Sequence, residues 1–411
     1  MVPAIDNPVV VIAPDSFKGS LSAADAAAAL ERGAREMLPE SATVLTFPMA
    51  DGGEGSLDAV LAAWLQPALT MTTVDAIGRE REASYGLDSE GRRAIIEAAQ
   101  SNGLPYVSDV PLQALRADSY GVGLIAARLI DNGARDVTLF LGGSATTDGG
   151  TGILRALGAR FLDAEGNELA PGGGALASLS TIDLSGLIAG ARETQWRIAV
   201  DVTNPLVGEQ GAAHVFGPQK GASASDVAVL DAGLTRLAEV LAETPLAAER
   251  GFSAAGICAL PGMGAGGGMA TPLVALFGAE LVPGAQLVAD AIGLSEVIAS
   301  ADIILTGEGR FDSQSLDGKV VDYLRGAKGP SGWLAVIAGS VGMSPSEAKA
   351  AGIDVALPLG SGIESRKELF QLAAPLLEAR GAHAIAEWFE PTDLDAEFRD
   401  EEGDDDATLG N

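Results

Sequence analysis

Short apolar runs alternate with polar loops and Ala-rich amphipathic stretches along most of this chain. Residues 9–13 form a continuous apolar, mainly β-branched run, and after a polar loop residues 22–37 are mostly Ala, Leu and charged residues. Ser22 stands where a helix cap is expected. Residues 43–49 and 57–65 repeat the order of strand, loop and helix. Repetition of this unit is typical of parallel α/β sheets.

The same order of strand, loop and helix returns later in the chain, after a stretch with a different residue pattern. Further apolar runs predict strands at residues 136–141, 198–202, 302–306, 334–338 and 355–357. Between residues 70 and 99, by contrast, short β-prone runs alternate with Gly and Asp turns, which predicts antiparallel or mixed strands.

These patterns predict two α/β domains. One is built on a parallel Rossmann- or flavodoxin-like sheet and is discontinuous, with residues 1–70 and 285–390, and the other is a mixed-sheet insertion of residues 71–284. The active site is expected in the cleft between them. Residues 391–411 are mostly acidic and carry few apolar residues, so we expect a disordered tail.

Composition narrows the classes of function. The formal charge of −30 opposes binding to nucleic acid or to anionic lipid, because both need clustered Lys and Arg. No apolar run approaches the ~20 residues of a membrane span, and the N-terminus lacks a signal-peptide pattern, so a cytoplasmic protein is expected. A single cysteine and two distant histidines predict that any metal is bound by oxygen ligands.

Ligands of open parallel sheets bind at the carboxyl ends of the strands, so polar loops after strands are the candidate sites. The loop after the first strand brings Asp15, Ser16 and Lys18 together, although Asp15 or Ser20 could simply cap the next helix. The loop at residues 50–55 has three glycines flanked by Asp51 and Glu54, a composition that also suits an ordinary turn.

A third loop, GGSATTDGG at residues 142–150, carries the strongest chemical signal. It precedes a predicted helix whose N-terminal amides suit a phosphate group. Hydroxyls in this loop can donate hydrogen bonds to phosphate oxygens, and Asp148 can hold Mg²⁺ or accept a proton. The loop is neither a Walker P-loop nor a protein-kinase motif.

Four other segments add candidates. In residues 306–313 two acids flank Arg310, which could clamp a carboxylate or form a surface ion pair. Residues 201–206 add an acid, Asp201, and an amide, Asn204, and residues 217–221 add a cation, Lys220. Gly262, Gly264 and Gly267 match a dinucleotide-binding spacing, but no convincing strand precedes them.

Together these segments resemble the bacterial glycerate kinase family of the glycerate 2-kinase type. The resemblance covers the chain to about residue 390, and seven motifs keep the family's order: APDSFKGSL at 13–21, ADGGEG at 50–55, GGSATTDGG at 142–150, ALGARFLD at 156–163, DVTNPLVG at 201–208, VFGPQKGA at 215–222 and TGEGRFDSQS at 306–315. It implies an enzyme that transfers the γ-phosphoryl group of ATP, with Mg²⁺, to D-glycerate, with 2-phosphoglycerate favoured as the product. Val122-Gly123, where the family usually has Thr-Gly, and the variant residues 261–268 depart from its pattern.

Phosphoryl transfer requires alignment of the reactants and neutralisation of charge, and roles are assigned on that basis. Either Asp148 or Asp201 accepts the substrate proton, and Lys18 acts with them in catalysis. The predicted substrate-binding residues are Asp15, Ser16, Asp51, Asn204 and Arg310. The predicted phosphate- or ATP-binding residues are Gly142, Gly143, Ser144, Thr146, Thr147, Lys220, Thr306 and Gly307. The predicted metal ligands are Asp148, Glu308 and Asp312.

Other functions stay open at this point. A kinase of another small hydroxy acid would use the same scaffold, because fold does not fix substrate. A NAD-dependent hydroxy-acid dehydrogenase would use the glycine spacing at residues 262–267, and a non-catalytic carboxylate-binding protein would also need Gly-rich loops. The sequence does not decide between a monomer and a homo-oligomer.

Overall fold

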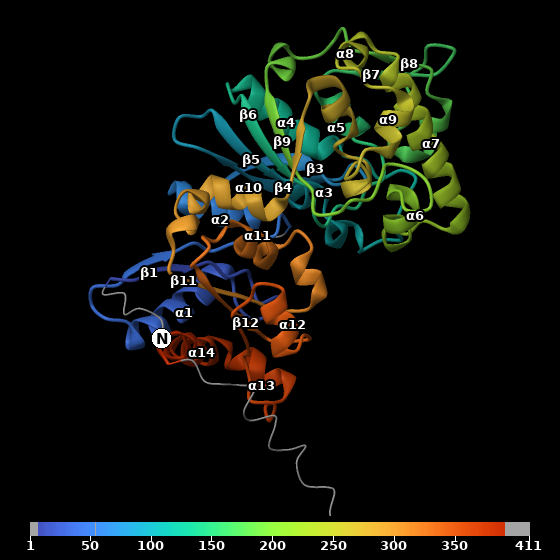
Figure 1. Ribbon diagram of the computed structural model, residues 1–411. Coiled ribbons are helices and arrows are strands. Elements are labelled where there is room, and N and C mark those ends of the chain that lie inside the picture. The colour runs from blue at the N-terminus through green and yellow to red at the C-terminus, as the bar shows by residue number, and fades with distance from the viewer. Residues whose placement is uncertain (1–6, 54, 391–411) are drawn as a thin grey trace, which may run out of the picture. The chain divides into compact units, whose positions relative to one another are not determined.

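The computed structural model describes residues 7–53 and 55–390 and divides the chain into two compact units. Unit 1 contains the described parts of Met1–Pro48, Ile298–Asp312 and Lys328–Asn411, and unit 2 contains those of Met49–Val297 and Ser313–Ala327. Each unit has helices and its own sheet, which confirms the predicted two-domain α/β fold class (Figure 1). The predicted acidic tail, residues 391–411, lies outside the described residues.

The boundaries defined by contacts differ from those expected at residues 70 and 285. Helix α2 (Ser56–Trp64) packs against two strands of the unit 2 sheet and against α10 (Gly284–Ile292), and α11 (Val320–Ala327) also packs against α10. Residues 49–70 and 313–327 therefore belong to unit 2, and so does α10.

Unit 1 is built on a five-stranded sheet in which all neighbouring strands are parallel. Its strands in spatial order are β13 (Val355–Pro358), β12 (Trp333–Ala338), β11 (Ile303–Glu308), β1 (Val9–Ile12) and β2 (Thr43–Thr46). The chain leaves β1 toward β2 on one side and leaves β11 toward β12 on the other. The carboxyl ends of β1 and β11 thus flank a switch point, the usual place for a ligand in such sheets.

Helix α1 (Ala23–Met37) covers this sheet together with α14 (Ala373–Phe389), beside which it lies (Figure 1). Ser22 caps α1 as predicted, since its Oγ accepts a hydrogen bond from the backbone N–H of Asp25 at 3.1 Å. The two helices approach very closely at Gly33, where an added Cβ would lie 1.8 Å from the carbonyl oxygen of Glu378. The other helices of unit 1 are α12 (Pro345–Ala350) and α13 (Arg366–Gln371).

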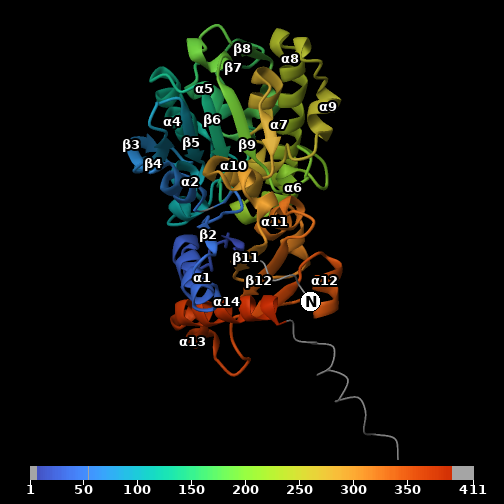
Figure 2. The ribbon, with the colours of Figure 1, turned by 60° about the vertical axis from the view of Figure 1, so that its left-hand side comes forward.

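Unit 2 contains a six-stranded mixed sheet (Figure 2). Its strands in spatial order are β10 (Glu280–Val282), β9 (Gln195–Ala199), β6 (Asp136–Phe140), β5 (Arg93–Glu97), β4 (Glu80–Leu87) and β3 (Leu69–Val74). β3, β4 and β5 are antiparallel neighbours, whereas β5, β6, β9 and β10 run parallel. A small antiparallel pair joins β7 (Arg160–Leu162) to β8 (Thr181–Asp183).

A large apolar core lies between the unit 2 sheet and its helices, with Leu139, Ile198 and Leu237 fully buried in it. The remaining helices are α3 (Ala99–Asn102), α4 (Tyr120–Asp131), α5 (Thr151–Ala156), α6 (Ala212–Phe216), α7 (Ala224–Ala242), α8 (Pro245–Glu249) and α9 (Ala254–Ala259). Within residues 7–53 and 55–390, no helix combines the length and the apolar character needed to cross a membrane.

The close approach of α1 and α14 predicts an unusual response to a helix-favouring substitution. Gly33→Ala should lower the free energy of unfolding of unit 1 by about 2 kcal/mol, because the added methyl group overlaps the α14 backbone. Gly326→Ala is the matched control, since nothing lies within 4 Å of its added Cβ, and it should be neutral or stabilising by up to about 1 kcal/mol. Urea unfolding followed by circular dichroism measures both. Equal transition midpoints for the two variants would contradict this packing.

Candidate active site

The carboxyl ends of β5, β6, β9 and β10 gather the polar loops of unit 2 at one edge of the sheet. Glu97 ends β5, residues 142–150 follow β6, Asp201 follows β9, and Gly284 follows β10. Parallel pairing of these four strands brings the loops together, as the ligand rule for such sheets requires.

Glycines let the backbone segments at this edge come unusually close. An added Cβ on Gly52, whose φ is +88°, would lie 2.8 Å from the Cα of Gly284, and one on Gly142 would lie 2.8 Å from the Cα of Gly53. No residue with a side chain fits at such distances. The glycines at residues 52–53 therefore join the loop that carries Asp51 to the loops after β6 and β10.

Asp201 lies at the centre of this arrangement and is partly buried. Its Oδ1 accepts a hydrogen bond from the backbone N–H of Gly284 at 2.7 Å. Burial raises the pKa of Asp201 to about 6, opposed mainly by the hydrogen bond from Gly284 and slightly by Lys319, and reinforced by the negative charge of Asp51. A carboxylate with such a pKa is ionised at neutral pH and is basic enough to accept a proton.

Glu97 and Lys319 belong to this edge but were not among the predicted site residues. Glu97 is buried, and its two carboxylate oxygens accept hydrogen bonds from the backbone N–H of Gly55 and from Gln100 Nε2, each at 3.1 Å. The strand-end rule could have found Glu97, which directly follows the buried run at residues 94–96. Lys319 comes from a distant segment and carried no sequence signal.

The structure does not favour the catalytic and metal-binding roles predicted for Asp148. Its side chain is 0% exposed. Oδ2 accepts hydrogen bonds from the N–H and Oγ–H of Ser119 and from the N–H of Gly152, at 2.7–3.0 Å, and Oδ1 accepts one from the N–H of Gly150 at 3.1 Å. With four donors around it, this carboxylate holds the start of α5 to the start of α4.

Asp118 extends the same network. Its carboxylate accepts a hydrogen bond from the backbone N–H of Tyr120 at 3.1 Å and pairs with Arg155 at 3.0 Å. Burial, with a further contribution from the negative charge of Asp148, raises the pKa of Asp118 to about 6. The segment before α4 and the loop after β6 are thus bound together by several polar contacts.

Lys220 lies directly beneath the loop after β6. The ammonium group is buried and donates hydrogen bonds to the carbonyl oxygen of Thr146 at 2.6 Å and to Oγ of Ser144 at 3.5 Å. Burial lowers its pKa to about 8, against the opposing effect of the Asp148 charge. A buried cation held by neutral oxygens is costly, and a bound anion would offset that cost.

The surroundings of this lysine contain polar atoms that the described part of the chain leaves without hydrogen bonds. Thr147 Oγ1, Asn102 Oδ1 and Ser101 Oγ are buried and have no partner there. By contrast, Thr146 Oγ1 accepts a hydrogen bond from Asn102 Nδ2 at 3.0 Å. Glycines, hydroxyls and a buried lysine are the groups that fit a phosphate.

In unit 1 the predicted residues of the first loop lie at the switch point. The backbone N–H of Asp15 donates a hydrogen bond to the carbonyl oxygen of Gly307 at 2.8 Å, which joins the end of β1 to β11. Asp15 and Ser16 are half-buried and Lys18 is exposed. The loop therefore offers carboxylate, hydroxyl and ammonium groups beside the end of β11.

Two predicted ATP-binding positions in β11 are used inside unit 1. Thr306 is fully buried and its hydroxyl donates a hydrogen bond to the carbonyl oxygen of Ala13 at 2.7 Å. Gly307 lies against the ring of Phe17: a Cβ added to this glycine would be 3.0 Å from the ring. These contacts hold β1 to β11, and the role of the two residues in ATP binding stays a prediction.

Arg310 forms an ion pair with Asp312, with 2.7 Å between Nε and Oδ2. This is the surface pair that the sequence left open as an alternative to a carboxylate clamp. Among the residues with described placement, no group of three or more His, Cys, Asp or Glu side chains is arranged to hold a metal ion. The roles of Asp148, Glu308 and Asp312 as metal ligands stay predictions, with Asp148 in unit 2 and the other two in unit 1.

Two further predicted features lie in unit 2 beside α9. Asn204 Nδ2 donates a hydrogen bond to the carbonyl oxygen of Gln210 at 2.8 Å, and the carbonyl oxygen of Asn204 accepts one from the N–H of Gly264. The glycines at residues 262–267 follow helix α9 and not a strand, which removes the structural context of a dinucleotide fingerprint.

Comparison with known proteins gives a consistent family match. The sequence model of the glycerate kinase family matches residues 10–390. A glycerate 2-kinase of Escherichia coli K12 is 42% identical over 311 residues, which cover 76% of this chain and 79% of the relative. A glycerate kinase of Halalkalibacterium halodurans is 38% identical over 386 residues, covering 93% and 99%. A crystal structure from Salmonella typhimurium LT2, provisionally named glycerate kinase 2, superposes with a TM-score of 0.80 at 37% identity and covers 93% of this chain and 98% of its own.

The hydrogen bonds of Asp148 predict a loss of stability when its charge is removed. Asp148→Asn places an NH₂ donor among four donors, so the free energy of unfolding should fall by about 2–4 kcal/mol. Asp131→Asn, at the exposed end of α4, is the matched control and should be neutral. Urea unfolding at pH 7 measures both, and an unchanged midpoint for Asp148→Asn would mean that this carboxylate does not hold the loop.

Burial of Lys220 predicts a difference in stability that depends on pH. Its pKa falls from 10.5 to about 8 on folding, so the cost of burying its charge is fully present below pH 8 and declines as the pH rises toward 10.5. Lys220→Met should therefore be more stable than the wild type at pH 7, by up to about 3 kcal/mol, and this advantage should narrow by pH 10. Lys349→Met, exposed on α12, should show no such trend in urea midpoints measured at both pH values.

Proposed function

Because this chain belongs to the glycerate kinase family, we propose that it transfers the γ-phosphoryl group of ATP to a hydroxyl of D-glycerate, with 2-phosphoglycerate as the product. Family membership makes the chain a phosphotransferase. The nucleotide, the configuration of the acceptor and the position of the new phosphate ester belong to the proposal.

One observation carries the proposal. The carboxyl edge of the unit 2 sheet presents a carboxylate of raised pKa, Asp201, and a Gly-rich loop above the buried ammonium group of Lys220. Phosphoryl transfer needs a group that orients and deprotonates the attacking hydroxyl, and donors that stabilise the charge of the transferring phosphoryl group. Asp201 supplies the base, and the Gly-rich loop with Lys220 supplies the donors.

We assign Asp201 as the base that accepts the proton of the glycerate hydroxyl. Its bond to the Gly284 N–H orients the carboxylate, and its raised pKa matches work near neutral pH. Asp148 is reassigned as a positioning residue, because its oxygens already accept four hydrogen bonds. Asp51 stays a candidate for substrate binding, and its charge helps to keep Asp201 basic.

We assign phosphate binding to the loop at residues 142–147 and to Lys220. The buried hydroxyl of Thr147 and the ammonium group of Lys220 are suited to bind phosphate oxygens of ATP. Mg²⁺, when bound with the nucleotide, would neutralise part of the phosphate charge. It needs only one or two protein carboxylates, for which Glu308 and Asp312 remain the candidates.

Unit 1 carries the remaining residues to which we assign a role. Lys18 offsets phosphate charge, and Asp15 and Ser16 are suited to hydrogen-bond the hydroxyl groups of glycerate. Arg310 would bind the substrate carboxylate by exchanging its pair with Asp312, a change of partner at the surface that costs little.

The test is consumption of ATP by the purified protein with Mg²⁺ and D-glycerate. Parallel reactions contain L-glycerate, glycolate, lactate or no acceptor, and phosphorus NMR identifies the product. Turnover that requires D-glycerate and yields 2-phosphoglycerate is expected. Turnover with another hydroxy acid and none with D-glycerate would show that the proposed substrate is wrong, while the assignment as a phosphotransferase would stand.

Substitution of Asp201 tests the assigned base. Asp201→Asn keeps an oxygen for the Gly284 N–H and should fold, but its kcat should fall by about 10²–10⁴-fold. Asp58→Asn, exposed on α2, is the control and should keep full activity. In the wild type, kcat/KM should fall about tenfold per pH unit below pH 6, because the base with a pKa of about 6 becomes protonated. Retention of near-wild-type turnover by Asp201→Asn would exclude it as the base.

A further inference from the structure

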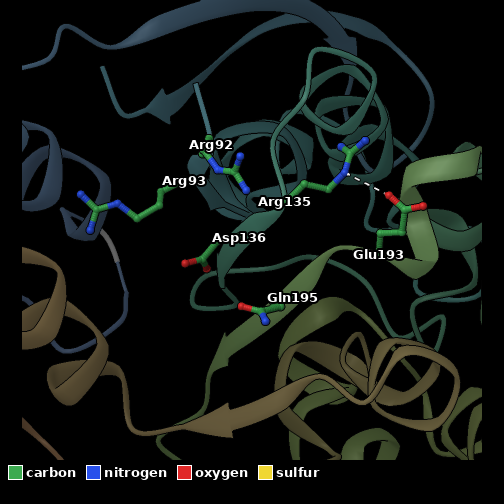
Figure 3. Close-up of a pocket in the computed structure, with 6 residues that line it drawn as sticks. All are labelled: Arg92, Arg93, Arg135, Asp136, Glu193 and Gln195. Atoms are coloured by element: carbon green, nitrogen blue, oxygen red, sulfur yellow. Dashed lines mark ion pairs between the residues drawn. The ribbon is translucent and has the colours of Figure 1, made fainter. Parts of the chain in front are cut away.

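The opposite edge of the unit 2 sheet holds a pocket rich in arginine (Figure 3). It is lined by Arg92, Arg93, Arg135, Asp136, Glu193 and Gln195 and has a volume of about 460 Å³. The whole protein has only 26 Lys and Arg against 56 Asp and Glu. Three arginines around one small pocket therefore form a local exception to the negative charge of the chain.

Strand register explains why these side chains lie together. Arg93, Asp136 and Gln195 are register partners at the first positions of β5, β6 and β9. The carbonyl oxygen of Arg92 accepts hydrogen bonds from the backbone N–H groups of Arg135 and Asp136, at 3.0 and 3.2 Å. The amino ends of β5 and β6 thus deliver three arginines to one place, and the amino end of β9 adds Glu193 and Gln195.

The guanidinium group of Arg135 is held in position. Its Nη1 donates hydrogen bonds to the carbonyl oxygens of Ile130 and Ala134, at 2.9 and 2.7 Å. A Cβ added to Gly190 would lie 3.0 Å from Cζ of Arg135. Glycine at position 190 therefore leaves the room that the guanidinium group occupies. An arginine that is already ordered loses less freedom when it binds an anion.

The side chain of Arg93, unlike those of Arg92 and Arg135, is directed to other residues. It pairs with Asp88 at 3.2 Å and its guanidinium lies 4.7 Å from the centre of the Trp64 ring. In Figure 3 its side chain points away from those of Arg92 and Arg135. Arg92 and Arg135 are consequently the cations available to a ligand, with the exposed amide of Gln195 beside them.

The acids around the pocket do not cancel this positive charge. Asp136 forms an ion pair at 2.9 Å with Arg197, a residue that does not line the pocket. Glu193 is 70% exposed and lies 3.6 Å from Arg135, a distance and exposure at which an ion pair contributes little. When Arg197 and Asp88 are included with the lining residues, four arginines face three carboxylates.

The pocket is separate from the candidate active site. Arg93 and Glu97 are the first and last residues of β5, so the two edges of the sheet are roughly 13 Å apart at ~3.3 Å per residue. A ligand in the pocket would not contact Asp201 or the loop at residues 142–147 directly. A second anion could therefore bind there while substrates occupy the other edge.

We propose that this pocket is a binding site for a small phosphate-bearing anion, held by Arg92, Arg135 and the amide of Gln195. Guanidinium groups suit phosphate because they donate two parallel hydrogen bonds. The ligand is inorganic phosphate or the phosphate group of a phosphorylated hydroxy acid, two sources with the same recognition chemistry.

Arginine labelling with phenylglyoxal, read residue by residue by mass spectrometry, tests the site independently of turnover. The wild-type protein is labelled with inorganic phosphate, with 2-phosphoglycerate, or with chloride at the same ionic strength. Phosphate or 2-phosphoglycerate should protect Arg92 and Arg135 severalfold more than Arg128, which is exposed on α4 outside the pocket. Protection of Arg92 and Arg135 no greater than that of Arg128, with both anions, would overturn the proposal.

Calorimetric titration with the same two anions provides the second measurement. The double variant Arg92→Gln/Arg135→Gln should lose one binding component or weaken it at least about tenfold, because two charge-assisted hydrogen-bond donors are removed. Arg128→Gln should retain it, and so should Lys220→Met, which affects the other edge of the sheet. Unchanged titration of the double variant would overturn the proposal, whereas loss of activity in the ATP assay alone would concern only the proposed function.

Discussion

The chemistry proposed for unit 2 depends on backbone segments that approach one another more closely than side chains permit. Gly52 against Gly284, and Gly142 against Gly53, replace side-chain packing with direct contact between main chains. This contact brings the backbone N–H of Gly284 within hydrogen-bond distance of Asp201. Burial raises the pKa of Asp201, the hydrogen bond from the Gly284 N–H opposes this rise, and the nearby charge of Asp51 adds to it. Glycine at these positions therefore determines which groups surround the Asp201 carboxylate as well as the turns of the backbone.

Local patterns predicted most of the secondary structure because the apolar runs coincide with buried strands. β1, β6, β11 and β12 lie where such runs occur, and Ser22 caps α1. β9 begins three residues earlier than expected, because the predicted run omitted the alternating residues 195–197. The extent of each unit could not be read in this way. α2 and α11 join unit 2 through contacts with α10, which are long-range and leave no local pattern.

The sequence predicted which loops lie at the candidate site, but it did not predict the role of each residue in them. The rule that ligands lie at strand ends identified the loops of Asp15, Asp51 and Asp201, and it could also have identified Glu97. It could not distinguish a carboxylate that faces a ligand from one that braces the fold. Asp148 has the sequence context of a catalytic acid, yet four hydrogen-bond donors surround it. Only the three-dimensional partners of a side chain reveal such a role.

The pairing of β1 with β11 also has a consequence for synthesis of the protein. Val10 pairs with Ile303, so the N-terminal strand is made long before its neighbour. At a translation rate of ~5–20 residues per second, β1 waits roughly 15–60 s for that partner on the ribosome. Most of unit 2, Met49–Val297, is complete before β11 is made. The inserted unit can therefore fold first, while the apolar face of α1 and the unpaired edge of β1 are open to molecular chaperones.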